Sequence, residues 1–347
     1  MRSKVLRVNA LPHGLDLSVF ERARARLRGR IVETALVHLR SGVVDERTGV
    51  DERGVVTTPA VDDRLPHDVW LKLECMQVTG SFKARGALNR VLSLPRAHLE
   101  RGIVTASGGN HGLAVAYAGR SVGARTTVYL PELTPASKAK RIERWGAEVV
   151  RAGEVWDDAH EAALARAERD GLTYVHPFAD PDVVAGQGTI ALEVLEKAPD
   201  TDAFIVAIGG GGLMAGVGAV ARLARPGIRV IGVEPIGAPT LHESLRANRV
   251  IELPSITTRA GTLAPRRSDP YTFDVIRSVV DEIVLVSDDE MRDAARYILE
   301  NVGVGVELSG AAAVAALLTG RANLAGAKRP CALVCGAGTD GCQLRVG

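Results

Sequence analysis

Short apolar segments alternate along this chain with amphipathic segments of about a dozen residues, and this alternation limits the fold more than any other feature. Apolar segments of strand length lie at 68–74, 102–107, 126–131, 147–152, 203–212 and 227–235. Helical periodicity marks 17–30, 81–94, 112–123, 137–146 and 156–171. Strands that alternate with helices in this way predict βαβ units, so we expect an α/β fold built on parallel sheets.

Three local patterns refine this outline. Ser81 stands where it can cap the helix at 81–94. The segment 188–196 (GTIALEVLE) repeats the alternation of apolar residues, and 282–300 combines a strand, a capped turn and a helix. Residues 41–66 lack helical periodicity and carry many charged and turn-forming residues, so we interpret them as an inserted surface loop or a small hairpin.

The bulk composition excludes several classes of protein. A chain of 347 residues suggests roughly two domains, and 46% apolar with 24% charged residues is ordinary globular composition. The net charge of +2 provides no basic field, so we expect no nucleic-acid partner. Four cysteines make no disulfide framework, the N-terminus lacks a signal-peptide core, and the alanine-rich stretch at 311–318 is too short to span a bilayer. We therefore expect a cytoplasmic protein with no membrane partner.

Lys83 is one of only seven lysines, although Lys and Arg together number 43. Arginine stays protonated in proteins, whereas a desolvated lysine can become a free amine. A free amine can form a Schiff base with a carbonyl compound, and a guanidinium cannot. The use of lysine here makes Lys83 a candidate catalytic residue.

A run of four glycines joins a strand to a helix at 203–216 (AFIVAIGGGGLMAG). Glycine permits close approach of the backbone to a ligand, and the following helix presents free N–H groups, so the loop suits a phosphate. The spacing of Gly210, Gly212 and Ala215, with Glu234 about twenty residues further on, also fits a dinucleotide fingerprint. A single phosphate, as in pyridoxal phosphate, fits the same N–H groups, and the motif alone leaves both cofactors open.

A second strand-to-helix loop lies at 105–114 (TASGGNHGLA). Ser107, Gly108, Gly109 and Asn110 offer N–H donors of the kind that bind a carboxylate, and His111 follows them without being assigned as a base. The chain thus offers an amine, a carboxylate loop and a phosphate loop in that order. An α-amino acid bound as an imine to pyridoxal phosphate needs all three, whereas a nicotinamide enzyme needs no lysine at the start of a helix.

Five ordered motifs resemble those of the fold type II pyridoxal-phosphate enzymes, in the serine/threonine dehydratase and serine racemase branch. They are SFKARGA at 81–87, SGGNHG at 107–112, AGQGTIALE at 185–193, GGGGLMAG at 209–216 and VCGAGTD at 334–340. The resemblance covers roughly residues 68–345. It implies a tryptophan synthase β-like fold with two parallel-type sheets, in a large domain (1–101 and 180–347) and a small domain (102–179), each with three layers.

The resemblance also implies roles for individual residues. Lys83 would hold pyridoxal 5'-phosphate as a Schiff base and later remove the Cα proton, with Phe82 near the cofactor ring. Asn110 would donate to the 3'-oxygen, Cys335 would lie against the pyridine nitrogen, and Glu307 would be an acidic residue near the cofactor. The phosphate would be bound by Gly209, Gly210, Gly211, Gly212 and Leu213. The substrate carboxylate would be bound by Ser107, Gly108, Gly109, Asn110 and His111.

The sequence departs from the family pattern in three places. Gly108 stands where mammalian-type racemases carry a serine that serves as the acid/base on the opposite face, which weighs against racemisation. Glu234 matches the first ligand of a cation site in related enzymes, but Thr240 replaces the last carboxylate, so we expect no metal and keep Glu234 as a weak candidate. The early Thr-Pro of the family reads Thr34-Ala35 and precedes the 41–66 insertion.

These observations predict a pyridoxal-phosphate-dependent ammonia-lyase that converts a β-hydroxy amino acid such as L-threonine or L-serine to a 2-oxo acid and ammonia. Cys335 favours this reaction, because a thiol is a poor acid and leaves the pyridine nitrogen largely unprotonated. A racemase or a β-replacement or threonine-synthase-like enzyme is the alternative within the same fold. A NAD-binding dehydrogenase and a non-catalytic amino-acid sensor are remote alternatives. The resemblance further implies a homodimer, and the choice of β-hydroxy amino acid and the role of the insertion stay open.

Overall fold

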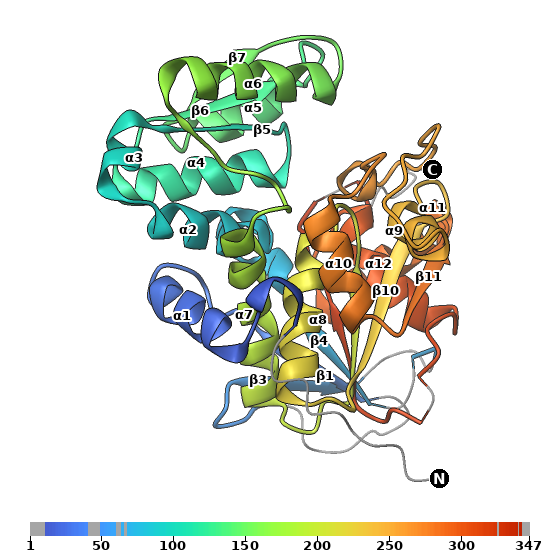
Figure 1. Cartoon of the computed structure of the whole chain (residues 1–347). Helices are drawn as coiled ribbons and strands as arrows, with labels where there is room; N and C mark the ends of the chain where they lie inside the picture. Colours follow the sequence, from blue (N-terminus) through green and yellow to red (C-terminus); the bar gives the residue numbers. More distant parts are fainter. Residues whose placement is uncertain are drawn as a thin grey trace.

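The computed structural model describes residues 11–40, 49–59, 64–65, 68–324, 326–338 and 340–341, and these form two sheets (Figure 1). The strands of the larger sheet are β1 (Leu36–Arg40), β2 (Gly49–Val50), β3 (Val55–Pro59), β4 (Asp68–Lys72), β9 (Ala203–Ala207), β10 (Arg229–Pro235), β11 (Glu282–Val286) and β12 (Pro330–Leu333). The smaller sheet contains β5 (Ile103–Ala106), β6 (Thr126–Leu130), β7 (Glu148–Arg151) and β8 (Thr173–Tyr174). Their orders are β11-β10-β9-β12-β4-β1-β3-β2 and β7-β6-β5-β8.

The helices connect and cover these strands. The α-helices are α1 (Leu17–Leu27), α2 (Lys83–Ser93), α3 (Arg96–Arg101), α4 (Asn110–Val122), α5 (Ala136–Glu143), α6 (Trp156–Asp170), α7 (Pro181–Lys197), α8 (Gly212–Ala224), α9 (Thr240–Arg246), α10 (Pro270–Val279), α11 (Asp288–Val302) and α12 (Leu308–Leu318). Short 3-10 helices lie at Pro12–Gly14, Glu74–Met76, Val78–Gly80 and Gly261–Leu263. Among the residues that the structure describes, no helix has both the length and the apolar character needed to cross a bilayer.

The smaller sheet is parallel throughout and is covered on both faces. Alternation along β6 explains how: Val128 and Leu130 pack with α4 and α5, while Tyr129 between them packs with α6. Both faces of the strands are therefore apolar, as expected for a parallel sheet between helices.

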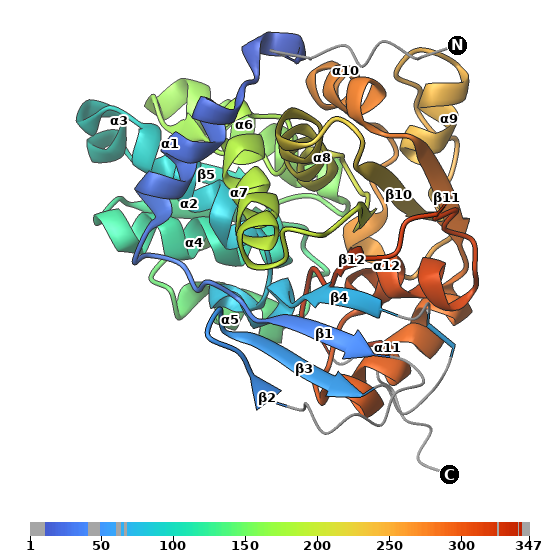
Figure 2. The same ribbon diagram turned by 90° about the horizontal axis from the view of Figure 1, so that it is seen from below.

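The larger sheet is mixed. β9, β10, β11, β12 and β4 pair in parallel, and α8 and α12 both pack on β9 and β10. β4 pairs antiparallel with β1, and β2 pairs antiparallel with β3, which is itself parallel to β1. Seen from below in Figure 2, β4, β1, β3 and β2 lie side by side at one edge of this sheet. The predicted α/β class is confirmed, and the antiparallel pairs are its departure from an all-parallel sheet.

Helix α2 lies between the two sheets and positions the predicted catalytic lysine (Figure 1). Its buried residues Ala87, Leu88 and Val91 pack with β5 and α4 of the smaller sheet. On its other side α2 contacts α7, which packs on α8 of the larger sheet. The first turn of α2 therefore belongs to the junction of both layers.

Three local predictions can now be compared with the structure. Ser81 does not cap α2: the helix begins at Lys83 with Phe82 at the N-cap, and Ser81 is extended because it forms a β-bridge with Gly336. The segment 188–196, for which the sequence showed apolar alternation, lies in α7 and is buried on most sides. Within 41–66, β2 and β3 form a hairpin, while 41–48, 60–63 and 66 lie outside the described residues. The proposed domain boundaries stay a prediction.

Candidate active site

Lys83 lies where the start of α2 meets the chain after β12. Ser81 forms a bridge with Gly336, and the main-chain N–H of Phe82 donates to the Cys335 carbonyl at 3.2 Å. The Lys83 amine donates to the Pro177 carbonyl oxygen at 2.7 Å. Burial lowers the pKa of Lys83 from 10.5 to about 8, against the opposite effect of Cys335 and Glu307. A substantial fraction of this amine is therefore neutral near physiological pH.

The Cys335 thiol belongs to the surroundings that affect the pKa of this amine, and it is almost completely buried. Its Sγ donates to the Ser309 carbonyl oxygen at 3.4 Å. Burial raises the pKa of the thiol, and Glu307 and Cys75 add to the effect. The group at this position is consequently a neutral thiol and not a thiolate.

Glu307 binds the Asn110 side chain and two hydroxyl groups through one carboxylate oxygen. Its Oε1 accepts hydrogen bonds from Asn110 Nδ2 at 2.8 Å, from Ser309 Oγ at 2.6 Å and from Thr262 Oγ1 at 3.4 Å. Burial raises the pKa of Glu307, opposed by the hydrogen bond from Ser309. The arrangement fixes the orientation of the Asn110 side chain.

The glycine loop follows β9 and leads into α8 as predicted, and its backbone is enclosed on both sides. A Cβ atom on Gly209 would lie 2.8 Å from the Thr262 carbonyl oxygen, and one on Gly212 would lie 2.8 Å from the Phe178 carbonyl oxygen. Gly211 adopts φ 99°, in the left-handed region that favours glycine. The loop thus accepts no side chains, and the first N–H groups of α8 have no partners within the helix.

The second loop ends β5 and starts α4. Gly109 N donates to Ser107 Oγ at 3.2 Å, and the helix begins at Asn110. The buried imidazole of His111 contacts the Val175 carbonyl oxygen through Nε2 at 3.0 Å. Burial, with a contribution from Lys83, lowers the pKa of His111 to about 3, so the ring is neutral. Its side chain is used for packing, and only its main-chain N–H belongs to the start of the helix.

Glu234 is hydrogen-bonded to main-chain groups at the start of α9. Its carboxylate accepts from the main-chain N–H groups of Leu241 at 2.8 Å and His242 at 2.7 Å, at the start of α9. Burial raises the pKa of Glu234 to about 8. Its oxygens are thus engaged and not offered to a ribose, which removes the support for the dinucleotide alternative. Across the described ranges, no group of three or more His, Cys, Asp or Glu side chains is arranged to hold a metal ion.

Residues 176–179 and the pair Thr262 and Ser309 complete the site, and the sequence reasoning missed both. The Pro177 carbonyl oxygen accepts a hydrogen bond from the Lys83 amine. Thr262 Oγ1 donates to Ser309 Oγ at 2.5 Å, and both hydroxyls also donate to Glu307 Oε1. The available signal for the first segment is a histidine and an aromatic residue around a proline, directly before the Asp-Pro start of a helix at 180–181.

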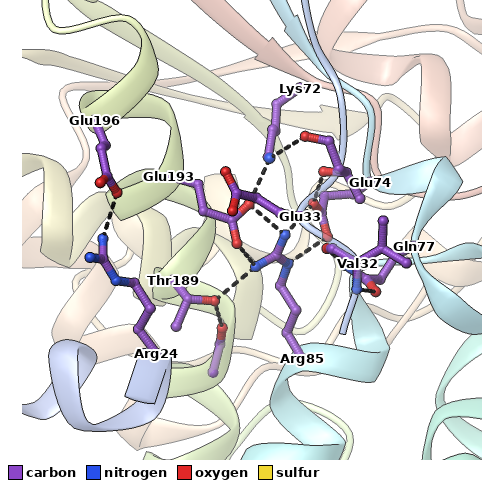
Figure 3. A network of polar contacts seen from close by, with 12 residues as sticks. Arg24, Val32, Glu33, Lys72, Glu74, Gln77, Arg85, Thr189, Glu193 and Glu196 are labelled. Atoms are coloured by element: carbon purple, nitrogen blue, oxygen red, sulfur yellow. Dashed lines mark hydrogen bonds and ion pairs between the residues drawn. The ribbon is translucent and has the colours of Figure 1, made fainter. Parts of the chain in front are cut away.

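A buried network of charges surrounds Arg85, which lies in the first turn of α2 (Figure 3). Arg85 Nε donates to Glu74 Oε2 at 2.7 Å, and Arg85 Nη1 donates to Glu193 Oε1 at 2.6 Å. Lys72 Nζ reaches the same Glu193 at 2.7 Å and the Thr34 carbonyl oxygen at 2.8 Å. The two positive and two negative side chains balance, as buried charges require.

This network fixes the helix that carries Lys83. Burial opposes the charge of Arg85, but Glu74 and Glu193 more than compensate and raise its pKa. Glu193 lies on α7 and Lys72 on β4, so α2 is tied to a helix and a strand by groups that cannot separate without leaving a charge unpaired. Lys83, two residues before Arg85, is thereby held in place.

The family model for "pyridoxal-phosphate dependent enzyme" matches residues 49–336. The chain belongs to this family of pyridoxal-phosphate-dependent enzymes. It is 40% identical to an L-threonine ammonia-lyase of Geobacter sulfurreducens over 92% of this chain and 75% of that protein. It is 36% identical to a serine racemase of Oryza sativa subsp. indica over 78% of this chain and 79% of that protein.

Solved structures of similar proteins show the same fold. Maize serine racemase matches with a TM-score of 0.83 at 30% identity, over 93% of each chain. A threonine deaminase from T.th. matches with a TM-score of 0.82 at 33% identity, over 93% of this chain and 98% of that chain. The predicted family, fold and cofactor are confirmed.

The residues of this chain fit the cofactor of the family. The glycine loop packs closely against neighbouring segments because side chains are absent there, and the first N–H groups of α8 have no partners within the helix, as a phosphate site requires. Burial lowers the pKa of the Lys83 amine to about 8, so a larger fraction of it is deprotonated near neutral pH than for an ordinary lysine. In the described part of the chain, the hydroxyl of Ser81, two residues before it, is buried and has no hydrogen-bond partner, as expected for a group that faces a ligand.

Proposed function

We propose that this enzyme is a pyridoxal-phosphate-dependent ammonia-lyase for β-hydroxy amino acids, of the kind represented by L-threonine and L-serine. The observation that carries the proposal is the combination of a buried Lys83 amine, whose pKa is lowered to about 8, with the neutral thiol of Cys335. The 40% identity to an L-threonine ammonia-lyase over most of the chain supports the same reaction.

The cofactor would be held by residues of both sheets. Gly209, Gly210, Gly211, Gly212 and Leu213 would bind its phosphate at the start of α8. Phe82, Asn110, Glu307 and Cys335 would surround its ring, and Lys83 would hold it covalently. When bound, pyridoxal phosphate supplies an electron sink for the charge that develops at the substrate Cα.

Lys83 is the base in this proposal. Its pKa of about 8 means that the amine can accept a proton near neutral pH and still release it afterwards. The hydrogen bond to Pro177 directs the lone pair of the amine away from that carbonyl and limits its motion. Since Arg85 and its carboxylate partners anchor the same turn, the base is positioned by the fold and not by the substrate.

Cys335 limits the lifetime of negative charge at Cα. A neutral thiol in a buried environment offers the ring nitrogen at most a weak hydrogen bond. Charge therefore leaves quickly through loss of the β-substituent, and transamination is disfavoured. Ser107, Gly108, Gly109, Asn110 and His111 would hold the substrate carboxylate at the start of α4, mostly through main-chain N–H groups.

A racemase is the second candidate, because the matches include serine racemases. The local structure around Gly108 favours the lyase. A Cβ atom on Gly108 would lie 3.0 Å from Cγ2 of Thr134, so the space for a larger residue is partly filled. A racemase needs proton donors on both faces of Cα, and a glycine at this position supplies none.

We further propose that the enzyme acts in the cytoplasm as a homodimer, as its family resemblance implies. Its three described cysteines, Cys75, Cys331 and Cys335, are buried and free, as a reducing compartment permits. Sedimentation of the purified enzyme with bound cofactor tests the dimer, which a sharp monomer boundary across micromolar concentrations would contradict.

The decisive experiment for the reaction combines spectroscopy with product analysis. The purified protein with pyridoxal phosphate should be yellow, and borohydride should attach the cofactor to the peptide that contains Lys83. A panel of β-substituted amino acids should then give ammonia and 2-oxo acids, with threonine or serine among the best substrates. Formation of the opposite enantiomer without ammonia would establish the racemase. If neither product forms, the protein binds amino acids without converting them.

A further inference from the structure

Residues 175–180, between β8 and α7, touch the amine side and the phosphate side of the candidate site at once. The Pro177 carbonyl oxygen accepts from Lys83 Nζ at 2.7 Å. Phe178, the next residue, lies against the glycine loop: a Cβ atom on Gly212 would lie 2.9 Å from its Cα. A change in the conformation of this segment would therefore move both the partner of the amine and the wall of the phosphate loop.

One side chain fixes that conformation. His176 Nδ1 accepts hydrogen bonds from two main-chain N–H groups, Phe178 N at 3.2 Å and Ala179 N at 2.7 Å. Pro177 has no N–H of its own to close the turn. The contacts between the His176 ring and these N–H groups replace the main-chain hydrogen bonds that an ordinary turn would contain, as aspartate or asparagine does in other turns.

The chemistry of these contacts defines the state of the ring. A main-chain N–H can only donate, so Nδ1 carries no proton and the neutral ring holds its proton on Nε2. Burial, together with His160 and Lys83, lowers the pKa of His176 to about 3, which keeps the ring neutral near physiological pH. The ring also packs edge-on against Phe178, with centroids 4.6 Å apart.

We propose that His176 is a positioning residue for the cofactor site. Its unprotonated Nδ1 holds residues 177–179 in the conformation that offers the Pro177 carbonyl to Lys83 and sets Phe178 against the glycine loop. The Lys83 amine and the glycine loop are thus coupled through the His176 imidazole, which acts on both through residues 177–179. This inference rests on the proposed function, since it concerns the site that binds pyridoxal phosphate.

Two substitutions separate the hydrogen-bond role of His176 from its volume. His176→Phe keeps an aromatic ring against Phe178 but removes the acceptor for both N–H groups. His176→Asn loses the ring but retains an acceptor oxygen at nearly the position of Nδ1. His160→Phe is the control for a neighbouring ring: His160 stacks on Trp156, bonds the Tyr174 hydroxyl and lies edge-on to His176 with centroids 6.4 Å apart, but the N–H groups of residues 178 and 179 bond His176 instead.

The test is binding of pyridoxal phosphate to each protein after removal of the cofactor, followed by absorbance and induced circular dichroism. Inhibition of that binding by inorganic phosphate reports the glycine loop separately. We expect His176→Phe to weaken pyridoxal phosphate binding at least tenfold and inorganic phosphate binding at least threefold, with a reduced dichroic signal. His176→Asn should stay within threefold of the wild type in both, and His160→Phe within twofold.

Two outcomes would overturn the proposal. If His176→Phe binds pyridoxal phosphate as tightly as the wild type, residues 177–179 keep their conformation without the Nδ1 acceptor. If His176→Asn and His176→Phe lose the same affinity, the effect comes from the volume of the ring and not from the hydrogen bonds. If His176→Phe does not fold, nitrogen-15 NMR of the wild-type histidines decides, since a protonated Nδ1 in His176 at neutral pH contradicts the proposal. Wild-type protein that binds no pyridoxal phosphate would instead overturn the proposed function.

Discussion

The side-chain amide of Asn110 donates a 2.8 Å hydrogen bond to Oε1 of Glu307, although 197 residues separate the two in the chain. Asn110 begins α4, beside the smaller sheet, and Glu307 precedes α12, beside the larger one. The contact therefore joins both halves of the site at the place proposed for the cofactor ring. Because an ionised Glu307 can only accept, it orients the amide so that the Nδ2 end of Asn110 points toward the carboxylate.

The first prediction concerns this pair. Asn110→Asp should place two acidic groups at hydrogen-bond distance and destabilise the folded protein by about 1–3 kcal/mol, because the buried Glu307 loses its donor. The double variant Asn110→Asp/Glu307→Gln restores a donor and an acceptor and should recover most of that loss. Urea unfolding of the single and double variants measures the coupling. Equal stability of the single and double variants would show that the pair contributes nothing.

The second prediction concerns the glycine loop. Gly212→Ala should weaken the binding of pyridoxal phosphate by about tenfold or more, because its Cβ would lie 2.8 Å from the main-chain oxygen of Phe178, which has little freedom to move. A loss of that size corresponds to about 1.4 kcal/mol of binding free energy. Gly227→Ala is the control, since nothing lies within 4 Å of a Cβ at that position. Absorbance titration compares the two, and similar affinities would remove the glycine loop from the site.

Many of the strands and helices and the two loops of the site could be predicted from the sequence, because these depend on local patterns. The phosphate loop is an example: four adjacent glycines between an apolar strand and a helix have few other uses. The same holds for Ser287, which accepts from Glu290 N at 3.1 Å in the capped turn that the sequence predicted. In both cases residues close in the sequence determine the local backbone conformation.

Other features depend on partners that are far away in the chain. Ser81 is a good N-cap residue by type, yet its β-bridge to Gly336 keeps it extended and moves the helix start to Lys83. The alternation at 188–196 is that of a helix buried on most sides, which periodicity alone does not distinguish from a strand. The sequence does not distinguish Arg85 from the other arginines, because its partners Glu74 and Glu193 come close to it only in the folded protein.

The third prediction concerns Arg85. Replacing it with methionine should destabilise the protein by about 3–5 kcal/mol, because Glu74 and Glu193 stay buried without their principal partner. Arg96→Met is the matched control: Arg96 and Glu100 form an exposed i,i+4 pair, which is worth less than about 1 kcal/mol. Urea unfolding of the cofactor-free proteins measures both. An Arg85 variant as stable as the Arg96 variant would mean that the network relaxes without cost.

The fourth prediction concerns Cys335. Cys335→Ser keeps a small neutral donor and should retain the rate of ammonia release within about threefold. Cys335→Asp should lower kcat by about tenfold or more, which corresponds to about 1.36 kcal/mol of activation free energy. An aspartate there would favour a protonated ring nitrogen and a longer-lived charge at Cα. The Asp variant should therefore also form more transamination product for each turnover. Chromatography of the cofactor after the reaction measures this ratio, and an unchanged ratio would separate Cys335 from the choice of reaction.

The fifth prediction is the pH dependence of Lys83 in the cofactor-free protein. Only the neutral amine reacts with an aldehyde, so labelling of Lys83 by formaldehyde and cyanoborohydride should rise with pH around a midpoint near 8, the value to which burial lowers its pKa. Exposed Lys138, quantified in the same digest by mass spectrometry, provides the internal reference.

The same shift has a consequence for stability whose sign is fixed. Because the pKa of Lys83 is about 8 in the folded protein and 10.5 in the reference state, the unfolded chain binds more protons between these values. The free energy of unfolding should therefore rise with pH across this window relative to Lys83→Met, in which the group is absent. Each unit of pKa difference corresponds to about 1.4 kcal/mol, so the gain is large enough to measure. A labelling midpoint near 10.5, with no difference in slope between the two proteins, would mean that the amine is solvated and would remove the physical basis of its role as a base.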